Sequence, residues 1–402
     1  MFILTNNYKI IFYLCLIYKF EYNIQLKEDK IMGLKAGIVG LPNVGKSTLF
    51  NAITNSHVEA ANYPFATINP NTRIVEVPDE RLDFLVNIFK PERTIPATIE
   101  FYDIAGLVRG ASKGEGLGNQ FLSHIRECDA IVEVVRCFTD SDIIHVEGDV
   151  DPIRDIEVIN LELVMADLET VTRRIEKIEN KARILKDKES VMEMSCLTPL
   201  KEALTNGVAA RNVPLSQEQE EVVYSYHLLT KKPIIYVANV GEEDLLDINS
   251  CENFNKVKEY ASKEHNEVIP VSCEIESQLS ELSKEEKVEF LKDLGIETSG
   301  LAQLIKATYK LLNLSTFFTV GADECRAWTF PNGYSAPKCA GIIHTDFERG
   351  FICAEVYTYD SIHELGSELA VKEAGKMRTE GKGYFPKDGD IMFFKFNVSG
   401  KK

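Results

Sequence analysis

The sequence predicts an α/β fold, in which a doubly wound, mostly parallel sheet carries an inserted α-helical hairpin and is followed by a small α+β domain. The first observation is that short β-branched segments alternate with helical stretches, as is typical of parallel sheets. The second is a heptad pattern of apolar residues that interrupts this alternation. The third is a strand-rich segment, bounded by turn signals, at the end of the chain.

Length and composition limit the classes of protein to which the chain can belong. Its 402 residues predict two or three domains, and its 45% hydrophobic content is ordinary for a globular protein. With 45 basic and 62 acidic side chains the net charge is −17, which argues against broad non-specific nucleic-acid binding but leaves room for a local basic patch. The nine cysteines show no CxxC spacing, which favours free thiols in a reducing, cytoplasmic compartment.

Residues 1–31 precede every motif in the chain. The apolar run from Ile10 to Tyr18 is shorter than the roughly 20 apolar residues of a bilayer span, and no small-residue cleavage site follows it. From Met32 the sequence enters a strand at once. We expect residues 1–31 to be an upstream start-site extension or a disordered leader, with a targeting peptide as the alternative. No contact with a membrane is expected.

The first domain is expected to cover residues 32–310. A short apolar strand from Ala36 to Gly40 runs into a glycine-rich turn, and Ser47 to Thr54 then has the pattern of a helix. Further segments are compact and β-branched, as buried parallel strands are. They are Thr98–Tyr102, Ile131–Arg136, Ile234–Ala238 and Val268–Val271.

One segment breaks the alternation with an apolar residue at every third or fourth position. The repeat consists of Leu161, Val164, Leu168, Val171, Ile175, Ile178, Ala182 and Leu185. A second helical stretch lies near Val191–Leu204, and Gly207 and Pro214 mark its end. Residues 150–215 are therefore expected to form an inserted antiparallel helical hairpin. This hairpin either only packs on itself or also projects as an arm that contacts a partner.

Residues 313–396 are expected to form a third unit. Turn signals at Pro331–Gly333 and Lys387–Asp390 separate its strands, and one helix is expected from about Ile362 to Glu373. The expected strands are Thr316–Val320, Glu324–Phe330, Ile352–Val356 and Ile391–Phe396. Strands around one helix, in about 85 residues, indicate a small α+β domain.

A complete phosphate-binding loop lies between the first strand and the first helix. Gly40-Leu41-Pro42-Asn43-Val44-Gly45-Lys46-Ser47 matches G-x-x-x-x-G-K-[ST] in the strand–loop–helix context that the motif requires. Backbone N–H groups of such a loop turn toward the phosphates, and the helix N-terminus adds positive potential. Lys46 is expected to reach the β- and γ-phosphates, and the Ser47 hydroxyl to bind Mg²⁺. Asn43, Val44, Gly45 and Thr48 complete the expected nucleotide contacts.

Two segments downstream are candidates for the magnesium side of this site. Asp103 follows the strand that ends at Tyr102 and begins the motif Asp103-Ile104-Ala105-Gly106. An acidic residue at that strand end is what a Mg²⁺–triphosphate site needs. Thr67, in Tyr63-Pro64-Phe65-Ala66-Thr67, is the candidate for a threonine that joins the magnesium shell. The alternative for Thr67 is an ordinary surface threonine.

The loop after the strand Ile234–Ala238 is where GTPases recognise guanine through Asn-Lys-x-Asp. Here it is Asn239-Val240-Gly241-Glu242, so the Asn is kept, the Lys is Val, and the Asp is a longer Glu. Adenine offers an acceptor at N1 that an ionised carboxylate does not satisfy, so the change weakens guanine specificity and makes adenine a plausible base. Asn239, Val240 and Glu242 are the expected base contacts, unless this is a plain strand-end loop. Ser272-Cys273-Glu274 is expected to be the last loop over the base.

Together these motifs resemble the YchF subfamily of Obg-related P-loop NTPases, the ribosome-binding ATPases, from residue 32 to residue 398. Besides the P-loop and the Asp103 motif, the resemblance rests on Asn62–Phe65, Lys113–Asn119, Arg326–Thr329 and His344–Glu348. It implies an Obg-type nucleotide domain with an inserted hairpin, and a C-terminal TGS domain of β-grasp type. It also implies ATP preference over GTP and binding to the large ribosomal subunit, with rRNA contacts through local patches. The segment 1–31 departs from the family.

The group that orients the attacking water is not the usual one. Many small GTPases place a Gln after D-x-x-G, but here that position is Leu107, which cannot hydrogen-bond water. The resemblance implies a histidine in a later loop, and the matching residue in Ile143-Ile144-His145-Val146 is His145. The alternatives are a structural histidine at this position, and a potassium ion or a partner's group as the source of catalysis.

The leading hypothesis for function is a slow, Mg²⁺-dependent ATPase switch whose nucleotide state sets its binding to the ribosome in translation or stress regulation. One alternative is a nucleotide-gated binding adaptor in which hydrolysis is incidental. Another is a GTPase of relaxed base specificity. Turnover with and without ribosomes separates the switch from the adaptor, and competition between ATP and GTP tests the third hypothesis.

Overall fold

The computed structural model describes residues 34–55, 71–104, 117–140, 143 and 148–397. The elements described below belong to one unit, residues 35–402. The N-terminal extension predicted for residues 1–31 lies outside the described residues. Within the described part of the chain, no helix combines the length and apolar character that a membrane span requires.

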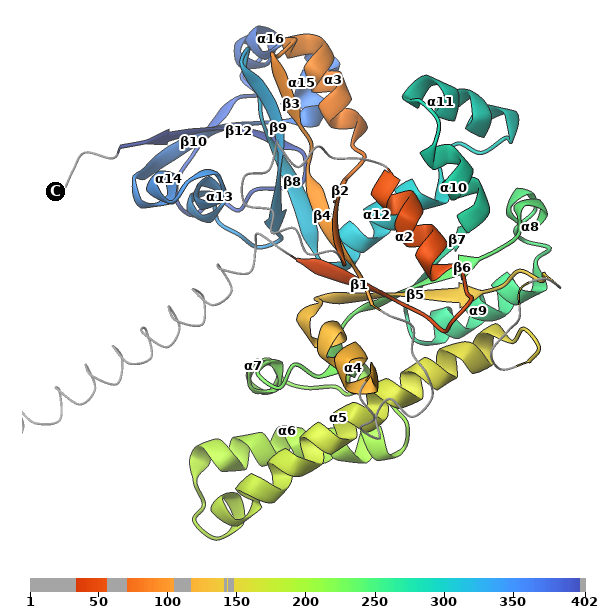
Figure 1. The fold of residues 1–402 in the computed structure, drawn as a ribbon. Helices are drawn as coiled ribbons and strands as arrows, with labels where there is room; N and C mark the ends of the chain where they lie inside the picture. Colours follow the sequence, from red (N-terminus) through yellow and green to blue (C-terminus); the bar gives the residue numbers. More distant parts are fainter. Residues whose placement is uncertain (1–33, 56–70, 105–116, 141–142, 144–147, 398–402) are drawn as a thin grey trace, which may run out of the picture. The chain divides into compact units, whose positions relative to one another are not determined.

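The first sheet has the strand order β2-β4-β1-β5-β6-β7 (Figure 1). Its strands are β1 (Lys35–Val39), β2 (Thr72–Glu76), β4 (Thr98–Asp103), β5 (Ala130–Arg136), β6 (Ile234–Asn239) and β7 (Glu267–Val271). All neighbours are parallel except β2 and β4, which are antiparallel. Every residue of β5 and β6 is buried, as expected for a parallel sheet covered on both faces. The predicted sheet is confirmed, with β2 as an edge strand that was not predicted.

Helices cover both faces of this sheet. Figure 1 shows α2, α10 and α12 on one face and α4, α5 and α9 on the other. The helices that follow the chain through the first domain are α2 (Lys46–Asn55), α3 (Glu80–Phe89), α4 (Leu117–Glu127), α8 (Glu242–Leu246), α9 (Glu252–Lys263), α10 (Cys273–Ser280), α11 (Lys284–Asp293) and α12 (Gly300–Leu311). The doubly wound arrangement therefore agrees with the α/β prediction.

The inserted hairpin consists of α5 (Pro152–Arg183) and α6 (Lys188–Thr205), with α7 (Gln217–Tyr224) packed against α6. Val164, Val171 and Ile178 of α5 are buried in one apolar cluster with residues of α6, as the heptad pattern predicted. The prediction was wrong for two residues of the repeat, because Leu161 is 56% exposed and Leu185 is 72% exposed. Ile156 and Ile159, in the first turns of α5, are buried although they lie outside the predicted repeat, and α5 contacts β5 and α9 as well as α6.

Polar contacts tie the hairpin together and to its return segment. Arg174 of α5 donates two hydrogen bonds of 2.7 Å to the carboxylate of Glu193 in α6. Asp167 of α5 accepts hydrogen bonds from the backbone N–H groups of Leu229 and Thr230, at 2.8 and 2.7 Å. The apolar cluster also includes Leu228. The packing of the hairpin therefore continues beyond residue 215, where its end was predicted.

The second sheet has the strand order β11-β10-β12-β8-β9-β3. Its strands from the C-terminal part are β8 (Leu314–Thr319), β9 (Glu324–Pro331), β10 (Phe351–Thr358), β11 (Arg378–Glu380) and β12 (Asp390–Phe396). The first and last of these, β8 and β12, lie side by side and parallel, as in a β-grasp fold. The edge strand β3 (Arg93–Ile95) comes from the nucleotide-binding part and pairs in parallel with β9. The sheet of the predicted domain 313–396 therefore includes a strand, β3, that lies outside this range in the sequence.

The helices of the C-terminal part differ from the prediction of one helix over Ile362–Glu373. That region forms α15 (Tyr359–Leu365) and α16 (Glu368–Glu373), separated by Gly366 with a φ of 77°. A glycine in this conformation ends a helix, and the Ser367 hydroxyl caps the next one by accepting from Ala370 N–H. Two further helices, α13 (Ala336–Ile343) and α14 (Thr345–Arg349), were not predicted. The prediction of a single helix over Ile362–Glu373 was therefore wrong, because Gly366 and Ser367 were not recognised as residues that end one helix and begin the next.

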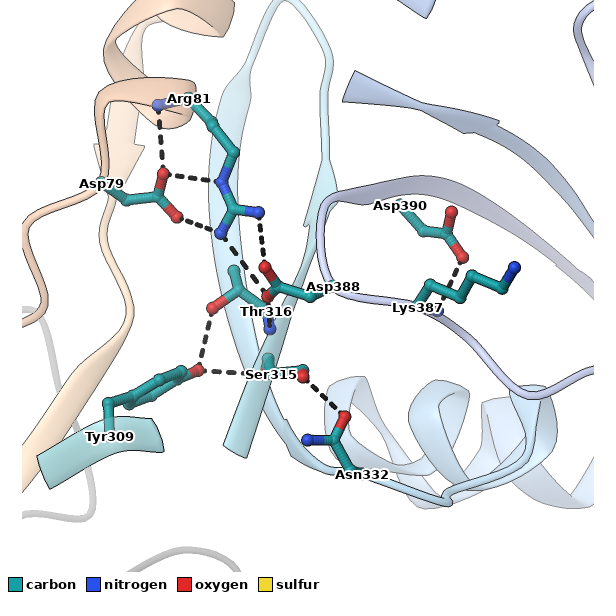
Figure 2. A network of polar contacts seen from close by, with 9 residues as sticks. All are labelled: Asp79, Arg81, Tyr309, Ser315, Thr316, Asn332, Lys387, Asp388 and Asp390. Atoms are coloured by element: carbon teal, nitrogen blue, oxygen red, sulfur yellow. Dashed lines mark hydrogen bonds and ion pairs between the residues drawn. The ribbon is translucent and has the colours of Figure 1, made fainter. Parts of the chain in front are cut away.

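A polar network joins α3 to the second sheet (Figure 2). Arg81 donates to both oxygens of Asp79, from Nε at 2.9 Å and from Nη2 at 2.8 Å, and its Nη1 donates to Asp388 at 2.7 Å. Asp388 also accepts the backbone N–H of Thr316 in β8 at 2.8 Å. The hydroxyls of Thr316 and Tyr309 in α12 are 2.8 Å apart. One guanidinium thus connects the cap of α3 to the turn before β12.

We predict that Arg81→Ala lowers the free energy of unfolding by about 1–2 kcal/mol. This is less than breaking a fully buried pair would cost, because the Asp388 side chain is 50% exposed. Arg93→Ala is the matched control, because Arg93 is 72% exposed and its nitrogen is 3.7 Å from Glu324. The control should change stability by less than about 0.5 kcal/mol. Urea denaturation measures both, and equal effects would contradict the importance of the Arg81 network.

Candidate functional site

The P-loop lies between β1 and α2 and lines a cavity of about 400 Å³. The lining residues are Leu41, Pro42, Asn43, Gly45, Lys46, Ser47 and Thr48. Two of them have left-handed backbone conformations, Asn43 with a φ of 63° and Gly45 with a φ of 96°. A Cβ on Gly45 would lie 2.1 Å from Nδ2 of Asn239, so only glycine fits there. The site residues predicted from Asn43 to Thr48 thus lie around one cavity, except Val44, whose side chain is buried.

Lys46 is the first residue of α2, and its ammonium is held against the end of β4. Its Nζ donates to the backbone oxygen of Ile104 at 2.6 Å and to Oδ1 of Asp103 at 3.2 Å. The structure therefore brings together the two residues that were predicted for the phosphate and magnesium sides of the site. The carbonyl of Ile104 was not predicted as a partner, because a backbone acceptor carries no signal in the sequence.

Oxygen donors for Mg²⁺ are present at this end of the sheet. The Ser47 side chain is exposed beside Lys46, and the Asp103 side chain is 29% exposed. No cluster of three or more His, Cys, Asp or Glu side chains suited to a metal occurs in the described residues. A hydroxyl and a carboxylate, completed by substrate phosphates and water, are the donor set that Mg²⁺ prefers in nucleotide sites. The third predicted ligand, Thr67, lies outside the described residues.

Asn239, at the end of β6, is a buried connection between two loops. Its Nδ2 donates to the carbonyl of Val44 in the P-loop at 2.9 Å, and its Oδ1 accepts from the N–H of Cys273 at 3.1 Å. The side chain is buried, with 4% of the residue exposed. Burial also raises the pKa of the Cys273 thiol to about 12, so this neighbour stays neutral. Asn239 therefore positions the P-loop and the start of α10 relative to β6.

The other predicted base contacts differ in their exposure. Val240 is only 2% exposed, and its N–H donates to the carbonyl of Val271 in β7 at 2.9 Å. Glu242 is exposed at the start of α8 and accepts a hydrogen bond from Nε2 of Gln278 in α10 at 3.1 Å. Of these two residues, only Glu242 offers a polar side chain to a ligand. Gln278 was not found by sequence analysis, because it lies outside every motif.

The candidate catalytic histidine, His145, lies outside the described residues, as does Leu107. The start of its loop is nevertheless attached to the sheet. Arg136, the last residue of β5, donates from Nη1 to the carbonyl of Ile143 at 3.0 Å. The neighbouring N–H of Cys137 donates to the carbonyl of Asn239 at 2.8 Å. The chain therefore leaves β5 beside the base loop, and Ile143, two residues before His145, is hydrogen-bonded to the end of that strand.

Two relatives show the family to which this chain belongs. A protein described as "Ribosome-binding ATPase YchF" from Bacillus subtilis is 58% identical over 91% of this chain and all of its own length. One with the same description from Haemophilus influenzae is 54% identical over the same shares. This chain belongs to the YchF family. The resemblance inferred from its motifs is thereby confirmed.

Family models and a solved structure agree with YchF membership. The model of the YchF GTPase C-terminal domain, described as a protein of unknown function, matches residues 314–397, and that of a "50S ribosome-binding GTPase" matches residues 35–181. A solved structure of the YchF GTPase of Schizosaccharomyces pombe is 43% identical, with a TM-score of 0.82. The match covers 90% of this chain and 98% of that one. The fold described above is therefore the YchF fold.

We predict that Asn239→Ala weakens the binding of ATP and GTP alike. The substitution leaves two buried backbone groups without a partner, which costs about 1–3 kcal/mol for each group, so both dissociation constants should rise at least about tenfold. The control is Asn253→Ala, which removes a 3.1 Å hydrogen bond to the carbonyl of Cys137 without touching the P-loop. Calorimetry measures the affinities. A selective loss of one nucleotide would show instead that Asn239 recognises the base.

Proposed function

We propose that this YchF protein is a Mg²⁺-dependent ATPase that binds ribosomes and changes its binding with its nucleotide state. The observation that carries the ATPase proposal is the Lys46 ammonium, held 3.2 Å from Asp103 in a complete P-loop. The proposal for ribosome binding rests on the description of relatives that are 58% and 54% identical over 91% of the chain. A protein with this partner acts in the cytoplasm, in translation or its regulation under stress.

The descriptions of the relatives disagree about the base, since some name an ATPase and others a GTPase. The base loop favours adenine in this chain. Val240 replaces the lysine whose stem covers guanine in GTPases, and its side chain is 2% exposed. Glu242 replaces the aspartate that accepts from guanine, and one of its oxygens is already engaged by Gln278. We therefore infer that ATP is the preferred substrate and that GTP binds more weakly.

Each residue of the phosphate site has a proposed role in this reaction. The backbone N–H groups near Gly45 bind the phosphates, and Lys46 contacts the β- and γ-phosphates. Ser47, Asp103 and Thr67 hold Mg²⁺, which when bound neutralises charge that develops on the phosphate oxygens. The contacts of Lys46 with Asp103 and Ile104 hold its ammonium beside the P-loop, where the phosphates are proposed to bind.

The ribosomal contact is proposed to involve the large subunit and its RNA. A net charge of −17 opposes binding to RNA over the whole surface, so contacts must come from local basic patches. We infer that one contact is the tip of the hairpin between α5 and α6, where four exposed basic residues outnumber the exposed acidic residues Asp187 and Glu189. The basic residues are Lys181, Arg183, Lys186 and Lys188. The hairpin thus supplies a suitable arm, as one of the two hypotheses for it required.

We predict that Lys46→Ala lowers ATP turnover at least about a hundredfold, because no other cation in the P-loop replaces the lysine at the phosphates. Lys263→Ala is the matched control, since Lys263 forms an exposed pair with Glu259 on α9. Phosphate release is measured with and without ribosomes, together with ATP-dependent co-sedimentation. Unchanged turnover in Lys46→Ala would refute the ATPase. ATP-dependent co-sedimentation that survives the loss of turnover would favour the binding adaptor.

A second prediction concerns His145, which is proposed to orient the attacking water in place of the Gln that Leu107 replaces. His145→Ala should lower kcat at least about tenfold, which corresponds to about 1.4 kcal/mol, with little change in the dissociation constant of ATP. His363→Ala in the C-terminal domain serves as the control and should alter neither quantity. If His145→Ala abolishes ATP binding, its role is structural. If it alters nothing, water is oriented by another group.

A further inference from the structure

We propose that Gln278 and Glu242 together form the pair that recognises the Watson–Crick edge of adenine. This inference rests on the proposed ATP specificity and assigns it to a residue outside the base-loop motif. It also resolves a chemical difficulty of that motif. An ionised carboxylate only accepts hydrogen bonds, so Glu242 alone leaves the acceptor N1 of adenine without a partner.

The structure leaves few other side chains of the base loop free for recognition. The Asn239 amide is occupied on both sides, by the carbonyl of Val44 at 2.9 Å and by the N–H of Cys273 at 3.1 Å. Val240 is apolar and buried. Glu242 is exposed, and its Oε1 accepts from Nε2 of Gln278 at 3.1 Å. Among Asn239, Val240 and Glu242, the exposed polar side chain is thus the Glu242 carboxylate, and the Gln278 amide of α10 is already bound to it.

The two members of the pair lie on the two helices that follow neighbouring strands. Glu242 begins α8 after β6, whereas Gln278 lies on α10, which begins at Cys273 directly after β7. The strands β6 and β7 are parallel neighbours, so both loops leave the same edge of the sheet. In open α/β sheets, ligands bind at the carboxyl ends of the strands. Helix α10 also packs against α2, which carries the P-loop lysine.

The donor and acceptor pattern of the pair is complementary to adenine. The hydrogen bond uses one N–H of Gln278 and one oxygen of Glu242, and leaves a second N–H and a second oxygen. The free oxygen can accept from the N6 amino group of adenine while the free N–H donates to N1. In the same pose, guanine would place its O6 against the carboxylate and its N1–H against the amide N–H. Both contacts would then be repulsive, so the pair selects adenine over guanine.

The test compares the affinities of non-hydrolysable Mg·ATP and Mg·GTP analogues for the full chain by calorimetry. Gln278→Leu keeps the size of the side chain but removes its donor, so the ratio of ATP to GTP affinity should fall at least about tenfold. Gln278→Glu offers guanine a second acceptor and should lower the ratio further. The matched control is Gln303→Leu, because Gln303 is an exposed glutamine that bonds only to a carbonyl within its own segment. This control should leave the ratio within about twofold.

The outcomes separate the inference from the proposed function. A wild-type protein that prefers GTP would overturn both. A wild-type preference for ATP that both Gln278 variants retain would overturn the adenine-reading pair alone. An equal loss of both nucleotides would also overturn it, because Gln278 would then only support the position of α10. A fall of the ratio in both variants, with turnover of ATP still dependent on Lys46, would support the pair.

Discussion

The site depends on the buried amide of Asn239, which satisfies one backbone group on each side of the nucleotide region. Val44 and Cys273 are buried, and the carbonyl of the first and the N–H of the second are hydrogen-bonded to this side chain, as buried backbone groups require. The amide can serve both only if the P-loop and the start of α10 approach β6 at fixed distances. Because Nδ2 of Asn239 lies where a Cβ of residue 45 would be, that residue must be glycine. Phosphate and base loops are therefore built as one assembly.

A second constraint concerns the segment from β2 to β4, which serves both sheets. In the first sheet β2 is the edge strand and β4 lies next to it, and β4 ends at Asp103, which contacts Lys46. Between them, β3 pairs with β9 of the second sheet, and Arg81 of α3 bonds to Asp388. The C-terminal domain is thus attached through the same segment that carries the predicted magnesium ligand Asp103. The strand β3, which pairs with the second sheet, and Asp103, which contacts Lys46, thus lie in one continuous segment of the chain.

The charge distribution accounts for how an acidic protein can bind a negatively charged nucleotide. The net charge of −17 keeps the surface repulsive toward phosphate in general. At the P-loop, inward-facing N–H groups, the start of α2 and the Lys46 ammonium supply local positive potential. The local geometry of the P-loop thus offsets the negative charge of the whole chain at the nucleotide site.

The sequence by itself determined the features that are local along the chain. Gly40–Ser47 is contiguous and lies between a strand and a helix, so a phosphate-binding loop at this place was predicted from the motif and its spacing alone. The buried strands β5 and β6 were recognised because parallel strands covered on both faces are continuous runs of apolar residues. Strong periodicity likewise identified the hairpin. Short helices such as α13 escaped, since they show too few turns for a pattern to be recognised.

Tertiary structure alone decided the features that join distant residues. Arg81 and Asp388 are 307 residues apart, and Glu242 and Gln278 are 36 apart, so no local pattern relates the members of either pair. The strand β3 has only three residues and takes its conformation from pairing with β9. Leu161 and Leu185 fit the heptad repeat but are exposed, Leu161 on α5 and Leu185 in the turn after that helix has ended. Periodicity reports which side chains share a face of a helix, whereas only packing decides whether that face has a partner.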